Sequence, residues 1–231
     1  MMKLNVKPVN FDFSKYLNGG FEFYKNNFGD ILLAYFFCFV MNIIPFCGIL
    51  GIGNLYRYLH RLRKGEPAGP GDIFDFGDFV PYFILQLIVF AGAIVIYLPM
   101  MIVGFIAGAE NGEPSPVFAM IMIPYMIIVM IAFLIVVLKA FYMPGLISIA
   151  GVKDIKTAWN MSVTMTKNNL LSIFLLVIIT AILGQLGIIF CGIGIFLTIP
   201  FVYASNFMAI EDALQQIQYD EITEIGVKNE Y

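Results

Sequence analysis

The longest apolar stretch in the chain runs from Asn168 to Ile210 and contains no Asp, Glu, Lys or Arg between them. As one helix it would be about 65 Å long at about 1.5 Å per residue, whereas the hydrocarbon core of a bilayer is about 30 Å thick. Two crossings joined by a tight turn use this length fully, and Cys191-Gly192-Ile193-Gly194 supplies the turn. The pattern therefore predicts a transmembrane hairpin.

A second charge-free stretch, Ile31 to Tyr56, is long for one crossing and short for two. Lys25 precedes it and Arg57 follows it, and basic residues in short flanking segments stay on the cytoplasmic side of a membrane. The number of crossings between them must then be even. The break is expected at Pro45-Phe46-Cys47-Gly48, and the arm that follows either spans fully or is re-entrant.

The third predicted hairpin consists of Phe79 to Ala109 and Val117 to Leu138. The loop from Glu110 to Pro116 has two acids and no Lys or Arg, so it should face outward. Lys139 then falls about 33 Å along the returning helix, at the cytoplasmic interface. In this arrangement every Lys and Arg lies on one side of the membrane.

Two further stretches are amphipathic. Phe11 to Phe28 has aromatic residues at helical spacing, with Ser14 as the expected N-cap, and predicts a helix lying in the interface. Gly151 to Asn168 predicts a basic interfacial helix, in which Trp159, the only tryptophan in the sequence, is the expected interfacial anchor.

We therefore predict an all-α, polytopic integral membrane protein, with six transmembrane segments arranged as three hairpins and with interfacial amphipathic helices. The predicted parts are a cytoplasmic interfacial helix (1–28), a six-helix membrane domain (29–210, with spans at about 29–46, 48–63, 79–108, 117–139, 170–190 and 193–210) and a loosely ordered, cytoplasmic acidic tail (211–231).

Composition agrees with a membrane protein. Of the 231 residues, 60% are hydrophobic and 13% are charged, whereas soluble domains have about 45–50% and about 25%. Near mid-membrane the predicted spans contain no Asp, Glu, His, Lys or Arg, and their polar residues include Asn42, Gln86, Thr180 and Gln185, besides several Tyr. Proton relays, ion-coupled transporters and intramembrane hydrolases place ionisable groups there. We therefore expect no enzymatic activity and no cofactor.

The chain also contains an internal similarity. Lys25-Asn26-Asn27, an apolar arm and Phe46-Cys47-Gly48-Ile49 parallel Lys167-Asn168-Asn169, an apolar arm and Phe190-Cys191-Gly192-Ile193. Membrane folds often grow by internal repeats. Chance similarity among apolar residues is the alternative interpretation.

The stretch from Val152 to Ser162, followed by Lys167-Asn168-Asn169, resembles a pattern of uncharacterised bacterial membrane families. These are related to the multi-helix membrane domain that accompanies some glycerophosphodiester phosphodiesterases. Gly51 to Tyr56 and Ile73 to Phe79 are similar to their first half. The resemblance implies a six-helix module without a catalytic domain, in the bacterial inner membrane. The distribution of Lys and Arg predicts that both termini are cytoplasmic. Some relatives carry a beta-carotene monooxygenase label, but such oxygenases hold iron with several histidines and this chain has only His60.

The candidate binding residues form a basic cytoplasmic rim, for which contact with anionic lipid headgroups is expected at about 1 kcal/mol per residue. The topology signal alone explains the same residues. The members of the rim are Arg57, Arg61, Arg63, Lys64, Lys153, Lys156 and Lys167.

Other candidates have simpler explanations that we favour. Asp72, Asp75 and Asp78 could hold a divalent ion, but a solvated face paired with the nearby arginines is commoner. His60 could sense pH or contact phosphate, but we expect an interfacial residue at a helix end.

Two features could link helices or chains. Cys47 could pair with Cys191, although buried free thiols are the commoner outcome. Gly104 and Gly108 form a small-xxx-small motif, for which we expect packing within one chain rather than a dimer face.

These observations predict a non-catalytic membrane module whose partners are membrane lipids, other membrane proteins or itself, and not nucleic acid. The alternative is a small transporter or pore subunit, because Gly and Pro interrupt the spans. A polar midplane cavity lined by Asn42, Gln86 or Gln185 would favour that alternative.

Overall fold

The computed structural model describes residues 6–111, 116–189 and 194–228, and all regular elements within these ranges are helical. The elements are α1 (Phe13–Asn26), α2 (Phe28–Ile43), α3 (Gly48–Lys64), η1 (Pro70–Phe74), α4 (Phe79–Asn111), α5 (Pro116–Lys139), α6 (Met143–Ser148), α7 (Ile155–Met165), α8 (Leu170–Gln185), η2 (Leu186–Ile189) and α9 (Gly194–Lys228). They form two compact units, described separately below: a main unit (residues 1–83 and 138–231) and a hairpin unit (Ile84–Val137).

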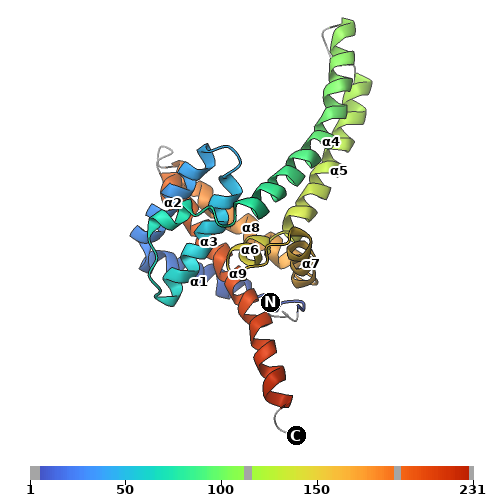
Figure 1. Ribbon diagram of the computed structural model, residues 1–231. Helices are drawn as coiled ribbons and strands as arrows, with labels where there is room; N and C mark the ends of the chain where they lie inside the picture. The colour runs from blue at the N-terminus through green and yellow to red at the C-terminus, as the bar shows by residue number, and fades with distance from the viewer. Residues whose placement is uncertain (1–5, 112–115, 190–193, 229–231) are drawn as a thin grey trace. The chain divides into compact units, whose positions relative to one another are not determined.

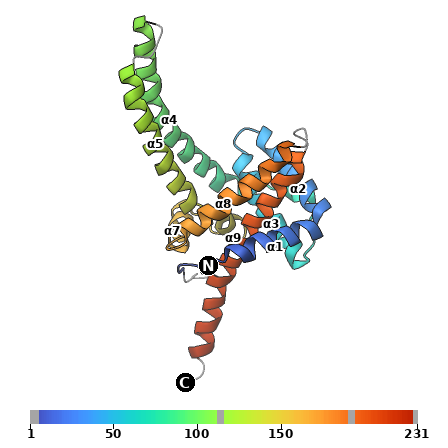
Figure 2. The ribbon, with the colours of Figure 1, turned by 180° about the vertical axis from the view of Figure 1, so that it is seen from behind.

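In the main unit, α9 packs against α1 on one side and α8 on the other (Figures 1 and 2). The contact with α1 is close because Gly20 faces α9: a Cβ built at Gly20 would lie 2.5 Å from Cα of Ser205. Tyr16 and Tyr24, one helical turn away on either side of Gly20, are buried. The tyrosine face predicted to lie in the membrane interface therefore packs within the protein. The N-cap of α1 is Asp12, which accepts from the backbone N–H of Lys15, and not the expected Ser14.

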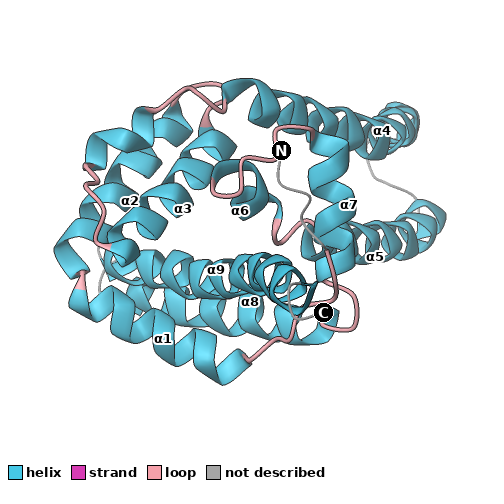
Figure 3. Cartoon of the chain, turned by 60° about the horizontal axis from the view of Figure 1, so that its bottom comes forward, coloured by secondary structure: helices cyan, strands magenta, loops and turns pink. Residues whose placement is uncertain are grey.

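The α2–α3 pair lies beside α6 in the same unit (Figure 3). Helix α2 ends at Ile43 and α3 begins at Gly48, so the chain breaks where Pro45 and Gly48 predicted. Phe46 in this turn has φ of 63°, a conformation that favours glycine.

The two copies of the internal similarity have matching helices. Asn27 and Asn169 occupy equivalent places in the two Lys-Asn-Asn sequences, and each is the N-cap of a 16-residue helix, α2 or α8. Their backbone angles are close, with φ of −123° and −119°. This agreement favours repetition over chance. Residues 190–193, the second turn, lie outside the described residues.

Four helical stretches in the described residues are long and apolar enough to cross a membrane: Phe79–Ile102, Met120–Ser148, Leu170–Ile188 and Gly194–Gln218. A fifth counts if α1 and α2, which are bent by 97°, form one broken span. Helix α3 is not among them, because it has only 17 residues and its second half carries Arg57, Arg61, Arg63 and Lys64. The six-segment arrangement therefore stays a prediction.

Beyond Ile210 the chain differs from the predicted loosely ordered tail, because α9 continues without a break to Lys228. Glu211 is buried, with an exposed fraction of 2%, and the first part of the acidic segment belongs to the packed main unit. The many acidic residues of this segment predicted a solvated tail, but Glu211 and Asp212, the first two acids, pair with residues of other helices.

The hairpin unit consists of most of α4 and α5, running side by side (Figure 1). Its apolar side chains point outward on both helices: Met101 is 71% exposed and Met120 78%. The hydroxyl of Tyr125 on α5 donates to the backbone O of Ile96 on α4 at 3.1 Å. Pro99 lacks the N–H that would pair with the backbone O of Val95, so the helix backbone is weakened directly beside this contact.

Candidate functional site

Helix α3 carries polar side chains on two stripes that face different neighbours. Residues three or four apart share a helix face, so Asn54, Arg57 and Arg61 form one stripe and His60 and Arg63 another. The first stripe faces the segment around η1, and the second faces α9. Carboxylates from distant parts of the chain attach to α3 through these stripes.

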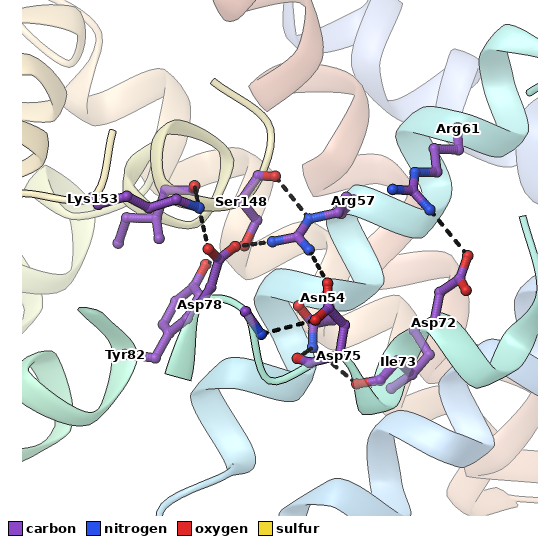
Figure 4. A network of polar contacts seen from close by, with 12 residues as sticks. Asn54, Arg57, Arg61, Asp72, Ile73, Asp75, Asp78, Tyr82, Ser148 and Lys153 are labelled. Atoms are coloured by element: carbon purple, nitrogen blue, oxygen red, sulfur yellow. Dashed lines mark hydrogen bonds and ion pairs between the residues drawn. The ribbon is translucent and has the colours of Figure 1, made fainter. Parts of the chain in front are cut away.

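The first stripe holds the η1 segment (Figure 4). Nη1 of Arg57 lies 2.6 Å from Oδ2 of Asp75, and its Nε donates to the backbone O of Ser148 at 3.0 Å. Nη1 of Arg61 lies 3.2 Å from Oδ2 of Asp72. Arg57 thus joins η1 to the last residue of α6, where free helix carbonyls attract a positive charge.

The backbone around η1 is fixed by an amide. Nδ2 of Asn54, a side chain with 1% exposure, donates to the backbone O of Ile73 at 2.9 Å and of Asp75 at 2.7 Å. Both acceptors are satisfied without water, which allows the segment to lie directly against α3.

Beside Asn54, Gly53 permits a close contact with α4 and α6. The hydroxyl of Tyr82 lies 2.8 Å from Oγ of Ser148, and a Cβ at Gly53 would lie 2.1 Å from that hydroxyl. Tyr82 is fully buried and cannot move aside easily. A side chain at position 53 would therefore push α3 away from this pair.

Asp78 is the buried carboxylate of the first stripe, with 2% exposure. It forms ion pairs with Arg57 and with Lys153, and Nζ of Lys153 also donates to the backbone O of Ile147 at 3.2 Å. Burial lowers the pKa of Lys153, and the positive charge of Arg57 lowers it further. Removing a carboxylate from water costs several kcal/mol, which two cations offset. Asp78 therefore serves as a joint between α3, the start of α4 and the α6–α7 connection.

Glu211 on α9 is the buried carboxylate of the second stripe. Its Oε1 lies 3.0 Å from Nδ1 of His60, and its Oε2 lies 2.6 Å from Nη1 of Arg63. Both oxygens of a carboxylate with 2% exposure are thus engaged by α3.

The next residue, Asp212, points to α1 instead. It pairs with Lys15, and its Oδ2 accepts from the hydroxyl of Tyr16 and from Nε2 of Gln216, each at 2.7 Å. Gln216 also exchanges two hydrogen bonds of 2.9 Å with the backbone of Asn10. Consecutive carboxylates therefore tie α9 to two different helices.

We call the eight side chains on and around α3 the α3 ionic cluster: Arg57, Arg61, Arg63 and Lys153 with Asp72, Asp75, Asp78 and Glu211. Four cations are matched by four carboxylates. The predicted pairing of the aspartates with the arginines is confirmed, but the prediction of a solvated face is wrong for Asp78. Glu211 was missed as a partner, although it is the first charged residue after the long apolar stretch.

The basic rim is therefore divided. Arg57, Arg61, Arg63 and Lys153 belong to the α3 ionic cluster. Lys64, Lys156 and Lys167 are exposed and form no ion pair with any residue that the structure describes. Trp159 is partly buried on α7.

The polar residues considered for transport are not gathered in the main unit. Asn42 is exposed near the end of α2 and donates to the backbone O of Cys38 at 2.8 Å, and Gln185 is exposed at the end of α8. Gln86, in the hairpin unit, is partly buried. In residues 6–111, 116–189 and 194–228, no three His, Cys, Asp or Glu side chains are placed to hold a metal ion.

For each of the two features that could link helices or chains, the structure describes the surroundings of one member, Cys47 and Gly104. Cys47 is a buried free thiol, while Cys191 lies outside the described residues. A Cβ at Gly104 would meet nothing within 4 Å. Packing within one chain, which we expected for the small-xxx-small motif, is thus not seen at Gly104.

A comparison with protein families gives one match, in which residues 78–221 fit a domain of unknown function, DUF7847. No curated protein and no solved structure matches the chain. The matched segment contains Asp78, Lys153 and Glu211 and begins after α3.

Proposed function

This chain belongs to the DUF7847 family of domains of unknown function, and on that premise we propose that it is a non-catalytic integral membrane module that associates with lipids or with other membrane proteins. Membership of this family identifies neither a substrate nor a reaction, so the proposal is argued from the residues of the chain itself.

The observation that carries the proposal is the outward-facing apolar surface of the hairpin unit. In an apolar 18-residue window of each of its two candidate spans, only 11% and 6% of the residues are buried within the protein. Such a surface in water would cost about 25 cal/mol for each Å² left exposed, whereas lipid chains or another membrane protein cover it without that cost. The surface is larger than a soluble monomer exposes.

The use of the ionisable groups supports a non-catalytic role. His60, the only histidine, has Nδ1 against Glu211, and both buried carboxylates, Asp78 and Glu211, are held by cations from α3. A general base needs a free lone pair facing a substrate. These groups instead join helices, which suits a module whose task is to hold a shape in the membrane.

We further propose six membrane segments, formed by the hairpins α2–α3, α4–α5 and α8–α9, with both termini cytoplasmic in a bacterial inner membrane. Helix α2 has 16 residues and α3 has 17, so each is about 24–26 Å long and crosses a core of about 30 Å only with local thinning. A re-entrant α2–α3 pair keeps the same even count. We also propose that the chain is related to the membrane domain that accompanies some glycerophosphodiester phosphodiesterases.

A small transporter or pore subunit is the second candidate. Three of the long helices have a proline in their interior, Pro99 in α4, Pro124 in α5 and Pro200 in α9. Interrupted helices surround substrate sites in transporters. Uptake of labelled solutes by proteoliposomes tests this candidate directly.

The experiment that tests association extracts the full chain from its membrane, with the surrounding lipid, in polymer nanodiscs without detergent. Mass spectrometry of the discs should find anionic lipid enriched over the bulk membrane, or a protein present in fixed ratio. Discs with the bulk lipid composition and no second protein would contradict the proposal.

A further inference from the structure

Helix α7 lies in the connection between two candidate membrane spans, Met120–Ser148 and Leu170–Ile188. Consecutive spans are joined on one side of the membrane, so the connection that contains α7 begins and ends at the same membrane surface. The inner face of α7 packs on the main unit through Ala158, Met161, Ser162 and Met165, and Oγ of Ser162 donates to the backbone O of Lys139 at 2.6 Å. That bond fixes the inner face beside the end of α5.

The outer face of α7 combines a cation with apolar side chains. Counting about 100° per residue, Lys156, Trp159 and Val163 lie on the side opposite the inner face. Lys156 is exposed and the other two are partly exposed. Lys167, just beyond the end of the helix, is also exposed. We call Lys156, Trp159, Val163 and Lys167 the α7 outer face.

The lysines of the α7 outer face form no ion pair with a described residue, unlike the cations on α3. The α3 ionic cluster has as many carboxylates as cations, so it attracts a negatively charged surface weakly. Asp154, the N-cap of α7, is two residues from Lys156, and its pKa is lowered by hydrogen bonds from Thr157 and also by the charge of Lys156. Its carboxylate forms no ion pair with Lys156 and instead accepts from the backbone N–H and the hydroxyl of Thr157, at 2.8 and 2.6 Å. Lys156 and Lys167 form no ion pair with a described residue.

From this contrast we infer that the α7 outer face, and not the arginine-rich end of α3, is the place where the protein binds anionic phospholipid headgroups, with the ammonium groups of Lys156 and Lys167 at the phosphates and Trp159 at the headgroup level. The inference rests on the proposed lipid association and assigns it to particular residues. It divides the basic rim into the four cations of the α3 ionic cluster, which pair with carboxylates of the protein, and the two lysines of the α7 outer face, which face lipid. Lys64, exposed at the end of α3, belongs to neither set.

Since Trp159 is the only tryptophan, its fluorescence reports on the α7 outer face alone. The full chain is reconstituted in nanodiscs of phosphatidylcholine with a minority of phosphatidylglycerol. In one sample the phosphatidylcholine carries bromine, which quenches tryptophan fluorescence on contact, and in the other sample the phosphatidylglycerol carries it. Brominated phosphatidylglycerol should quench Trp159 more than its share of the lipid predicts. At about 1 kcal/mol per basic residue, each of Lys156→Gln and Lys167→Gln should lower this preference about fivefold.

The matched control is Arg61→Gln, which also removes one positive charge. Arg61 and Asp72 form an exposed pair, so the variant should fold and keep the quenching preference of the unchanged protein. Quenching by each brominated lipid in proportion to its share of the bilayer would overturn the inference while leaving membrane association intact. An Arg61→Gln effect as large as that of Lys156→Gln would assign the headgroups to α3 and also overturn it.

Discussion

Nδ1 of His60 lies 3.0 Å from Oε1 of Glu211, so the only histidine of the sequence is joined to a carboxylate that is 2% exposed. The two residues are 151 positions apart, on α3 and α9. Arg63 completes the contact on the other oxygen of Glu211. This arrangement ties the last long helix to the α2–α3 pair.

The two sides of this contact should respond unequally to mutation. Arg63→Met leaves Glu211 buried with less compensation and should destabilise the fold by about 3 kcal/mol. Glu211→Gln leaves Arg63, a partly exposed side chain that water can reach, and should cost about 1–2 kcal/mol. Thermal unfolding of both variants in nanodiscs shows which of them loses more stability. Equal losses, or a larger loss for Glu211→Gln, would contradict the role given to burial.

The α1–α9 contact should depend on the absence of a side chain at Gly20. Gly20→Ala places a Cβ 2.5 Å from Cα of Ser205, and should cost about 1–3 kcal/mol because backbone must move. Gly29→Ala is the matched control, since a Cβ there meets nothing within 4 Å and alanine favours the helix by up to about 1 kcal/mol. If both variants melt at the same temperature, the α1–α9 packing described here is incorrect.

In the hairpin unit, Tyr125→Phe should weaken the association of α4 with α5. The lost bond to the backbone O of Ile96 is worth about 0.6 kcal/mol, the average found for hydrogen bonds between membrane helices. Tyr97→Phe removes a hydroxyl from an exposed position on α4 and should have no effect. Proteolysis of the reconstituted chain between α4 and α5 should be faster for Tyr125→Phe only.

The N-cap of α7 should make the α7 outer face sensitive to acid. The hydrogen bonds from Thr157 hold the pKa of Asp154 below its usual value. A lowered pKa contributes stability that is complete above the unfolded value, about 3.9, and is lost as the pH falls through the folded value. Trp159 emission should therefore be constant from neutral pH down to about 4 and change below it.

Asp154→Ala should give the acid-type emission of Trp159 already at neutral pH, because the cap is lost. Asp154→Asn keeps an acceptor for the backbone N–H of Thr157 without the charge, and should keep the neutral emission while losing the change in acid. If the Asp154→Ala protein has unaltered emission at every pH, then the Asp154 cap does not affect the surroundings of Trp159, and the prediction is wrong.

Helix positions were predictable where one local cause decides them. Pro45 and Gly48 fixed the break between α2 and α3, and the Lys-Asn-Asn sequences marked the starts of α2 and α8. Asp12 and Ser14 are both good N-caps, and only the fold selects Asp12.

The candidate site was predictable only where its partners are close in sequence. Asp72, Asp75 and Asp78 follow α3 within a short segment, so their pairing with its arginines was expected. The pairing of Glu211 depends on how α9 packs on α3, which no local pattern encodes. The burial of Asp78 likewise depends on Lys153, which is 75 residues away in the sequence.

The most direct test of the account asks whether the hairpin unit lies in lipid while the basic end of α3 lies in the cytoplasm. Single cysteines replace Val95, which is 71% exposed on α4, and Lys64 in a cysteine-free background, and a membrane-impermeant maleimide is added to intact cells and to opened membranes. We expect no labelling at position 95 in either preparation, and labelling at position 64 only after opening. Rapid labelling of position 95, or of position 64 in intact cells, would contradict the account.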